Sequence, residues 1–267
     1  MNNMAQARYS GFVLFNGVLT RAADLGISYF PKWFIISTPI PYLLFGLFGL
    51  VLISWRLIRK PIKFLDTYEN RLQFIFAVCF GAPIALILIF NPILYDGWRH
   101  LYFVYPPFVF LCIYGVNYII EKWGETIPYM ILVITFGFII TFMYNNFPLQ
   151  YVYFNRLVNT QTHDHLRYQY DLEYWGISYK QCLEYILEND QSKTINVFVE
   201  GAAGRYNLNI LPNSYRDRIR YVDIIDAKYV ITNLRTNPIG FEEFQNKIWH
   251  SIQVGNNTVA IIYKIHE

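Results

Sequence analysis

The chain has 267 residues, of which 54% are hydrophobic, 19% are aromatic and only 15% are charged, with a net charge of +3. Soluble domains carry about 25% charged residues, so this composition excludes a disordered chain and argues against an ordinary soluble globule. Charged residues are absent from four stretches, 33–55, 72–95, 101–120 and 126–155. The tail from 150 to 267 has 25 charged residues among 118. We therefore expect a membrane domain over 1–147 and a soluble domain over 148–267.

The N-terminal residues precede the first long apolar stretch. Residues 1–10, MNNMAQARYS, lack the basic-then-apolar pattern of a secretory signal peptide. Residues 11–31 are partly apolar but are interrupted by Arg21 and Asp24. This pattern predicts an interfacial or re-entrant segment, with the end of a preceding span as the alternative.

The charge-free stretches come close to the roughly 20 apolar residues that a bilayer-spanning helix needs. They predict four transmembrane helices, at about 33–55, 72–95, 101–120 and 127–145. In the first of these, Pro39 and Pro41 fall in the first turns, where proline disrupts a helix least.

The loop 56–71 fixes the expected orientation of these spans. It carries five basic residues, so the positive-inside rule places it in the cytoplasm. Alternation along the chain then places the turn 95–100 and the whole tail on the extracytoplasmic side.

The tail has the pattern of an α/β domain. Residues 178–189 have apolar positions at helical spacing, with Ser178 as the expected N-cap. The segments 195–201 and 227–234 predict short buried strands. Residues 241–251 predict an amphipathic helix, and 251–265 predict a terminal β-hairpin.

The first candidate site is the turn between the second and third spans. Asp96, Arg99 and His100 lie there between two long apolar stretches, close to the membrane surface. The planar guanidinium of Arg99 suits phosphate oxygens, and His100 adds a donor or a titratable group. Asp96 could orient either of them. The alternative is a solvated turn whose charges mark the ends of two spans.

The second candidate site is aromatic and lies just after the fourth span. Aromatic planes beside carboxylates and amides are suited to holding sugars, and five residues have this character: Tyr151, Asn155, Asp171, Tyr174 and Trp175. The alternative is an aromatic belt that packs the tail against the membrane domain.

Other patterns favour no cofactor, metal or nucleic acid. His163 and His165 flank Asp164, but a solvated polar loop explains this triplet as well as a metal site does. Gly201–Gly204 follow a predicted strand without the spacing of a dinucleotide site. Three cysteines without a CxxC pair predict neither a disulfide framework nor a zinc site. The charge distribution does not indicate nucleic acid as a partner.

Four blocks, 29–50, 95–111, 148–158 and 170–186, together resemble the C-terminal half of bacterial C-type membrane glycosyltransferases. They are similar to the dolichyl-phosphate-mannose–protein mannosyltransferase group. The resemblance implies a bacterial inner-membrane enzyme with a polyprenyl-phosphate-linked sugar as donor and membrane lipid as partner. It also implies that Arg99 and His100 contact the lipid phosphate, that Asp96 orients them, and that the tail covers the site and helps to bind the acceptor.

One part of the family's pattern has no counterpart in this sequence. The resemblance places the catalytic acid in a first extracytoplasmic loop, and no acidic pair precedes the first span. We therefore leave the catalytic residues unassigned and expect the C-terminal portion of a glycosyltransferase, incomplete alone. It would be one product of a split gene whose N-terminal half is encoded separately, a fragment, or a degenerate partner subunit. The alternative function is a non-catalytic membrane anchor, or partner subunit, that presents an α/β interaction domain.

Overall fold

The computed structural model describes residues 11–159, 162–235 and 237–266. The first ten residues, on which the signal-peptide prediction depends, lie outside this set. The chain forms two compact units. Unit 1 contains Arg21–Phe142 and Phe154–Val158, whereas unit 2 contains Phe12–Thr20, Met143–Tyr153 and the remainder of the tail. Each unit therefore includes a short segment from the other half of the sequence.

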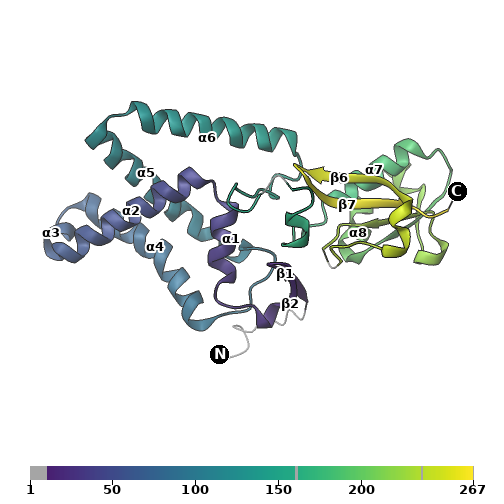
Figure 1. The fold of residues 1–267 in the computed structure, drawn as a ribbon, viewed down its shortest axis with the longest axis horizontal. Coiled ribbons are helices and arrows are strands. Elements are labelled where there is room, and N and C mark those ends of the chain that lie inside the picture. The colour runs from purple at the N-terminus through teal and green to yellow at the C-terminus, as the bar shows by residue number, and fades with distance from the viewer. Residues whose placement is uncertain (1–10, 160–161, 236, 267) are drawn as a thin grey trace. The chain divides into compact units, whose positions relative to one another are not determined.

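Unit 1 consists mainly of helices (Figure 1). They are α1 (Tyr29–Ser37), α2 (Ile40–Arg59), α3 (Pro61–Leu65), α4 (Tyr68–Phe90), the 3-10 helix η2 (Arg99–Val104), α5 (Tyr105–Trp123) and α6 (Thr126–Asn145). Among the described residues, four helical stretches are long and apolar enough to cross a membrane: α2, α4, η2 with α5, and α6. This agrees with the four predicted spans to within a few residues at most boundaries.

The first predicted span, 33–55, begins in the wrong place. The structure divides this region into α1 and α2, with Thr38 in an extended conformation (φ −103°, ψ 137°) between them. A residue that precedes proline is disfavoured in the helical region, and Pro39 has no N–H to continue the helix. The first membrane-length helix therefore begins at Ile40 and continues to Arg59.

The segment 11–31, predicted to be interfacial or re-entrant, begins with a β-hairpin. Strands β1 (Phe12–Phe15) and β2 (Val18–Arg21) are joined by Asn16 and Gly17, which have φ values of 56° and 77°. Two consecutive residues with positive φ form the turn that matches the twist of a hairpin, and Asn-Gly is its preferred sequence. The 3-10 helix η1 (Ala22–Asp24) follows before α1.

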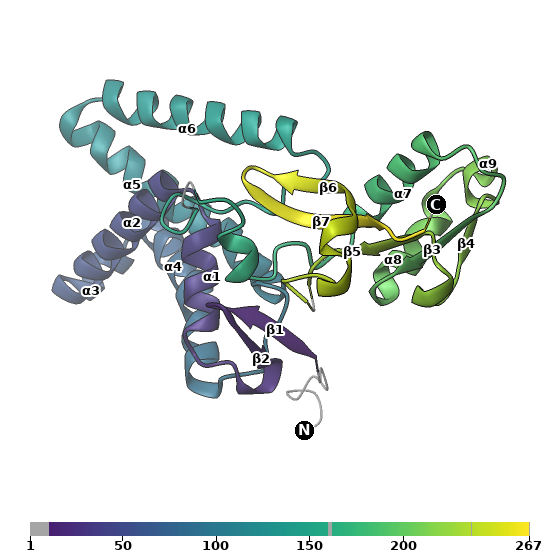
Figure 2. The ribbon, with the colours of Figure 1, turned by 45° about the vertical axis from the view of Figure 1, so that its right-hand side comes forward.

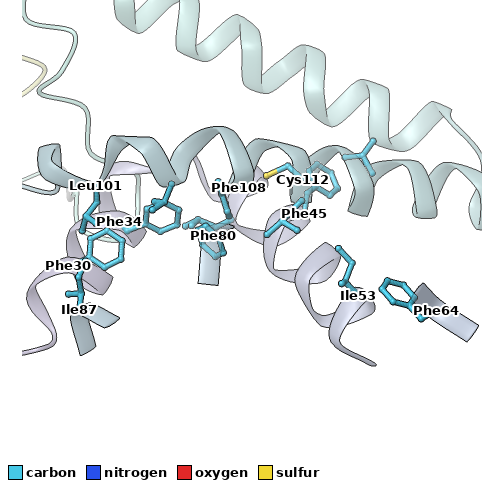
Figure 3. Close-up of a cluster of buried hydrophobic side chains, with 14 residues drawn as sticks. Phe30, Phe34, Phe45, Ile53, Phe64, Phe80, Ile87, Leu101, Phe108 and Cys112 are labelled. Atoms are coloured by element: carbon cyan, nitrogen blue, oxygen red, sulfur yellow. The ribbon is translucent and has the colours of Figure 1, made fainter. Parts of the chain in front are cut away.

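Helices α2 and α5 pack at close range in unit 1. A Cβ atom added at Gly115 would collide with the Phe45 carbonyl, and one added at Gly49 would collide with the Leu111 carbonyl. Small residues of this kind let two helix backbones approach closely where no hydrophobic effect acts between them. The buried cluster around this contact includes Phe108 and Cys112, which Figure 3 shows along α5.

Unit 2 contains a five-stranded sheet, whose strands are labelled in Figure 2. The strands are β3 (Ile195–Val199), β4 (Ile219–Tyr221), β5 (Tyr229–Thr232), β6 (Ile248–Val254) and β7 (Asn257–Lys264), in the order β4-β3-β5-β7-β6. Strand β3 is parallel to both β4 and β5, and β7 is antiparallel to β5 and β6. The predicted strands and terminal hairpin are thus present, together with the short strand β4.

The two faces of this sheet are covered by different elements. Helix α7 (Ser178–Asn189) packs Cys182, Leu183 and Ile186 against one face, as its apolar spacing predicts. On the other face, Phe241 and the 3-10 helix η6 (Glu242–Lys247) pack against a second buried cluster. Strands β5 and β7 are buried on both faces, apart from the exposed Lys264 at the end of β7. Their apolar residues accordingly run without interruption over 229–231 and 259–263.

The amphipathic helix predicted over 241–251 is wrong. Only the short 3-10 helix η6 forms there, and β6 starts at Ile248 and pairs with β7. The apolar spacing fits a helix locally. Strand β7, however, offers backbone hydrogen-bond partners to this segment, and this tertiary pairing overrides the local helix preference. The other short helices described in this unit are α8 (Gly201–Asn207), α9 (Asn213–Arg216) and the 3-10 helices η3 (Leu166–Tyr168), η4 (Leu208–Ile210) and η5 (Ile224–Asp226).

Candidate functional site

The turn between α4 and η2 has an unusual backbone. Asp96 has a φ of 55° and Gly97 a φ of 69°, so two consecutive residues adopt the left-handed conformation. The Gly97 N–H donates a hydrogen bond of 3.0 Å to the hydroxyl of Tyr29 in α1. Asp96 is only 3% exposed. The turn therefore packs against α1 and is not a loose solvated connection.

Arg99 and His100 are brought together on one aromatic ring, and Asp96 joins them through Arg99. Arg99 forms an ion pair of 3.0 Å with Asp96. The Arg99 guanidinium also lies 4.8 Å from the ring centroid of Tyr95, and the same ring makes an edge contact with the His100 imidazole at 4.8 Å. Tyr95 was not among the predicted site residues. It holds the two nitrogen-bearing side chains on one patch.

Trp98 attaches this turn to the end of α1. Its indole N–H donates a hydrogen bond of 2.8 Å to the Ser37 hydroxyl, which in turn donates to the Trp33 carbonyl at 2.6 Å. The Trp98 ring packs edge-on against Phe34 at 5.2 Å and contacts Tyr105 at 5.8 Å. These contacts fix the position of Arg99 and His100 relative to α1 and α5.

An apolar cavity of about 510 Å³ lies between α2, α5 and α6 in unit 1. Its lining includes Phe45, Tyr105, Ile113, Val116, Leu132 and Phe136. Tyr105, at one limit of the lined stretch of α5, is the residue that contacts Trp98. The cavity therefore extends along α5 from the neighbourhood of the Asp96–Arg99 turn.

Asn155, predicted as an acceptor contact, makes contacts within unit 1. Its Nδ2 donates to the carbonyls of Ile35 and Thr38 at 2.6 and 2.7 Å, and its own N–H donates to the Ile36 carbonyl at 2.8 Å. These carbonyls belong to the end of α1, which lacks partners within its own helix. Asn155 thus caps α1 and is only 3% exposed.

The other four residues predicted with Asn155 belong to unit 2. Tyr151 contacts the ring of Tyr174 at 5.4 Å, and Tyr174 contacts the ring of Trp175 at 5.6 Å. Trp175 is 49% exposed. Asp171 is buried and accepts a hydrogen bond of 3.2 Å from the Leu14 N–H, which anchors hairpin β1–β2. Within this set, Trp175 presents the most accessible aromatic surface.

Glu173 is the organising residue of this region, and the sequence predictions did not include it. Its carboxylate accepts hydrogen bonds from the Tyr151 hydroxyl, the Ile177 N–H, the Ser178 hydroxyl and Asn233 Nδ2. Burial raises the pKa of Glu173, although these four hydrogen bonds partly lower it. The only local sequence signal was a carboxylate set among apolar and aromatic residues just before a helix.

The prediction that Ser178 is the N-cap of α7 is wrong, because the Glu173 carboxylate takes that role. Ser178 is the first residue of α7, and its hydroxyl donates to Glu173. Glu173 also accepts the backbone N–H of Ile177 at 2.9 Å. A residue five positions earlier therefore satisfies the groups that a serine N-cap would otherwise serve.

The histidine–aspartate triplet has a structural role. Asp164 accepts hydrogen bonds from the Thr258 N–H at 2.6 Å and from Arg167 at 3.1 Å, which ties its loop to β7. His163 is mostly exposed. Within the described ranges, no group of three or more His, Cys, Asp or Glu residues is placed to hold a metal ion.

Comparison with known proteins does not identify a relative. The sequence matches no protein-family model, and neither the curated proteins nor the solved structures contain a match to it. A functional assignment must therefore start from the geometry of the two units.

Proposed function

We propose that this chain is the C-terminal portion of a membrane glycosyltransferase that transfers a sugar from a polyprenyl-phosphate donor to an extracytoplasmic acceptor. Arg99 and His100 bind the donor phosphate. The observation that carries this proposal is the arrangement of both side chains on the Tyr95 ring, with Arg99 paired to the buried Asp96. This patch lies at the start of a helix long and apolar enough to cross a membrane.

The arrangement suits a phosphate for two physical reasons. Guanidinium presents several N–H donors in a fixed plane, and hydrogen bonds between charged partners are the stronger kind. In addition, Asp96 and Tyr95 hold Arg99 before any ligand arrives, so binding costs less side-chain entropy. His100 is exposed beside it and supplies a second donor.

The cavity between α2, α5 and α6 suits the lipid part of such a donor. Its lining is predominantly apolar, and it spans Tyr105 to Ile120 on α5, which corresponds to roughly 22 Å of helix. An isoprenoid chain could lie along this surface while its phosphate reaches the turn that precedes α5.

The transfer itself breaks the bond between the anomeric carbon and the phosphate oxygen of the donor. An acceptor hydroxyl or amine forms the new bond to that carbon and loses its proton to a general base, a role that we assign to no residue of this chain. The phosphate leaves with the bonding electron pair. Donors placed where this negative charge develops lower the barrier, and Arg99 and His100 are suited to that role.

The proposed orientation rests on charge at the opposite ends of the helices. Arg56 and Arg59 lie in the last turn of α2, and three further basic residues follow before or within the first turn of α4: Lys60, Lys63 and Arg71. The positive-inside rule places this loop in the cytoplasm, with unit 2 extracytoplasmic in a bacterial inner membrane.

Binding of a short donor analogue tests the proposal. Farnesyl phosphate titrated into the full chain in lipid nanodiscs should bind at least about tenfold more weakly to Arg99→Ala, because a charged hydrogen bond is lost. The double variant with His100→Ala should bind more weakly still. Arg59→Ala is the matched control, since Arg59 packs on Trp55 in the basic loop region. Unchanged binding by the double variant would refute the proposal and favour a non-catalytic anchor that presents an interaction domain.

A further inference from the structure

A second cavity lies in unit 2, at the carboxyl ends of two parallel strands. Ile195 and Val197 of β3 pair with Ile219 and Tyr221 of β4, so both strands end at the same edge of the sheet (Figure 2). The cavity at this edge has a volume of about 410 Å³. It is lined by Phe198, Val199, Arg205, Tyr221, Val222 and Asp223. Ligands of α/β domains commonly bind outside the carboxyl ends of parallel strands.

The connection after β3 leaves this edge open. Gly201 has a φ of 79°, which lets the chain turn directly from β3 into α8, and a Cβ atom added there would meet no neighbouring atom. The Tyr221 hydroxyl donates a hydrogen bond of 2.9 Å to the Gly204 carbonyl and holds α8 beside β4. The walls of the cavity are therefore attached to the sheet.

Two opposite charges line this cavity. Arg205 comes from α8 and Asp223 follows β4, and within the described part of the chain neither side chain has a hydrogen-bond or ion-pair partner. Burial raises the pKa of Tyr221 to about 12, while the positive charge of Arg205 acts in the opposite direction. The guanidinium is thus close enough to influence the Tyr221 hydroxyl on the cavity wall.

We propose that this cavity binds a small anionic carbohydrate, with Arg205 holding its phosphate or carboxylate group and Asp223 accepting hydrogen bonds from its hydroxyls. The guanidinium fork matches the paired oxygens of either anion, and an ionised carboxylate acts only as an acceptor. The volume lies at the lower end of the range for ligand pockets, which suits one sugar ring with its charged group. This site involves no residue of unit 1 and does not depend on the transfer reaction proposed above.

Two probes distinguish the source of the anion. Glucose 6-phosphate and glucuronate are titrated separately into the full chain in nanodiscs, with binding measured by calorimetry and by saturation-transfer NMR. Uncharged glucose and inorganic phosphate serve as comparison ligands. We expect at least one of the two anionic sugars to bind saturably, and on the order of tenfold more tightly than glucose or phosphate alone.

Two exposed residues that do not line the cavity provide matched controls. Arg205→Gln and Asp223→Asn should each weaken binding of the anionic sugar, whereas Arg220→Gln and Asp226→Asn should leave it unchanged. Equal losses in the lining and control variants would overturn the proposal. Saturable binding of phosphate as tight as that of both sugars, or binding of neither sugar, would also overturn it.

Discussion

Replacing Glu173 with alanine should destabilise unit 2 far more than the loss of one exposed carboxylate would. Glu173 is 1% exposed and accepts from four donors. Asn233 Nδ2 keeps a second acceptor, the Glu173 backbone carbonyl at 2.8 Å. The Tyr151 hydroxyl, the Ile177 N–H and the Ser178 hydroxyl lose the acceptor that the structure gives them. An unsatisfied buried donor costs at least about 1 kcal/mol, so the variant should lose about 3 kcal/mol.

Hydrogen–deuterium exchange measures this loss in the intact chain. The network ties the segment before α7 to Asn233, which directly follows β5. Opening of the β5 amides should therefore become easier by about 3 kcal/mol, which corresponds to roughly hundredfold faster exchange. Glu184→Ala is the matched control, because Glu184 only pairs with Lys180 on the surface of α7. Such pairs contribute about 0.5 kcal/mol or less.

The comparison of these two variants can refute the reasoning. If β5 amides exchange in Glu173→Ala no faster than in Glu184→Ala, the carboxylate does not hold unit 2 together. Glu173→Gln should give an intermediate effect, since it keeps one acceptor oxygen and replaces the other with a donor.

Two further predictions concern packing in unit 1 and pH dependence in unit 2. Gly115→Val should lower the free energy of unfolding in detergent by about 2 kcal/mol, measured by thermal denaturation, because overpacking separates α2 from α5. Gly137→Ala, where an added Cβ meets open space, should change it little, and equal effects would contradict this packing. For Asp190, burial raises the pKa, but hydrogen bonds from Ser192, Lys228 and Tyr229 outweigh burial and hold the pKa below its usual value of 3.8. Its contribution to stability is therefore present above pH 3.8 and is lost on further acidification. Urea unfolding at pH 7 and pH 3 should show a smaller acid loss in Asp190→Asn than in the wild type, and an equal loss would count against this role.

The sequence predicted the candidate transmembrane helices and much of the α/β pattern because both depend on local composition. Within a bilayer, each backbone group must find its partner inside the helix, so an uncharged run of about 20 residues has few alternatives. Likewise, α7 shows its buried face in its own spacing, and β5 and β7 show their burial in the uninterrupted apolar runs 229–231 and 259–263. The Asn16-Gly17 turn is also specified locally, because Asn-Gly favours two consecutive positive φ values.

Tertiary structure alone decided which distant residues meet. The position of Asn155 at the end of α1 depends on a chain segment about 120 residues away, and β6 replaces a predicted helix because β7 is available as a partner. Glu173 gained its role from Tyr151 and Asn233, which no spacing rule connects to it. Composition therefore determines which segments leave water, because desolvation acts on each segment separately. The polar partners of Glu173 and Asn155 come from distant parts of the chain, so composition does not reveal them. The contacts of Arg99 and His100 with Tyr95 are local in the chain, but they depend on the backbone conformation of the turn, which only the folded structure shows.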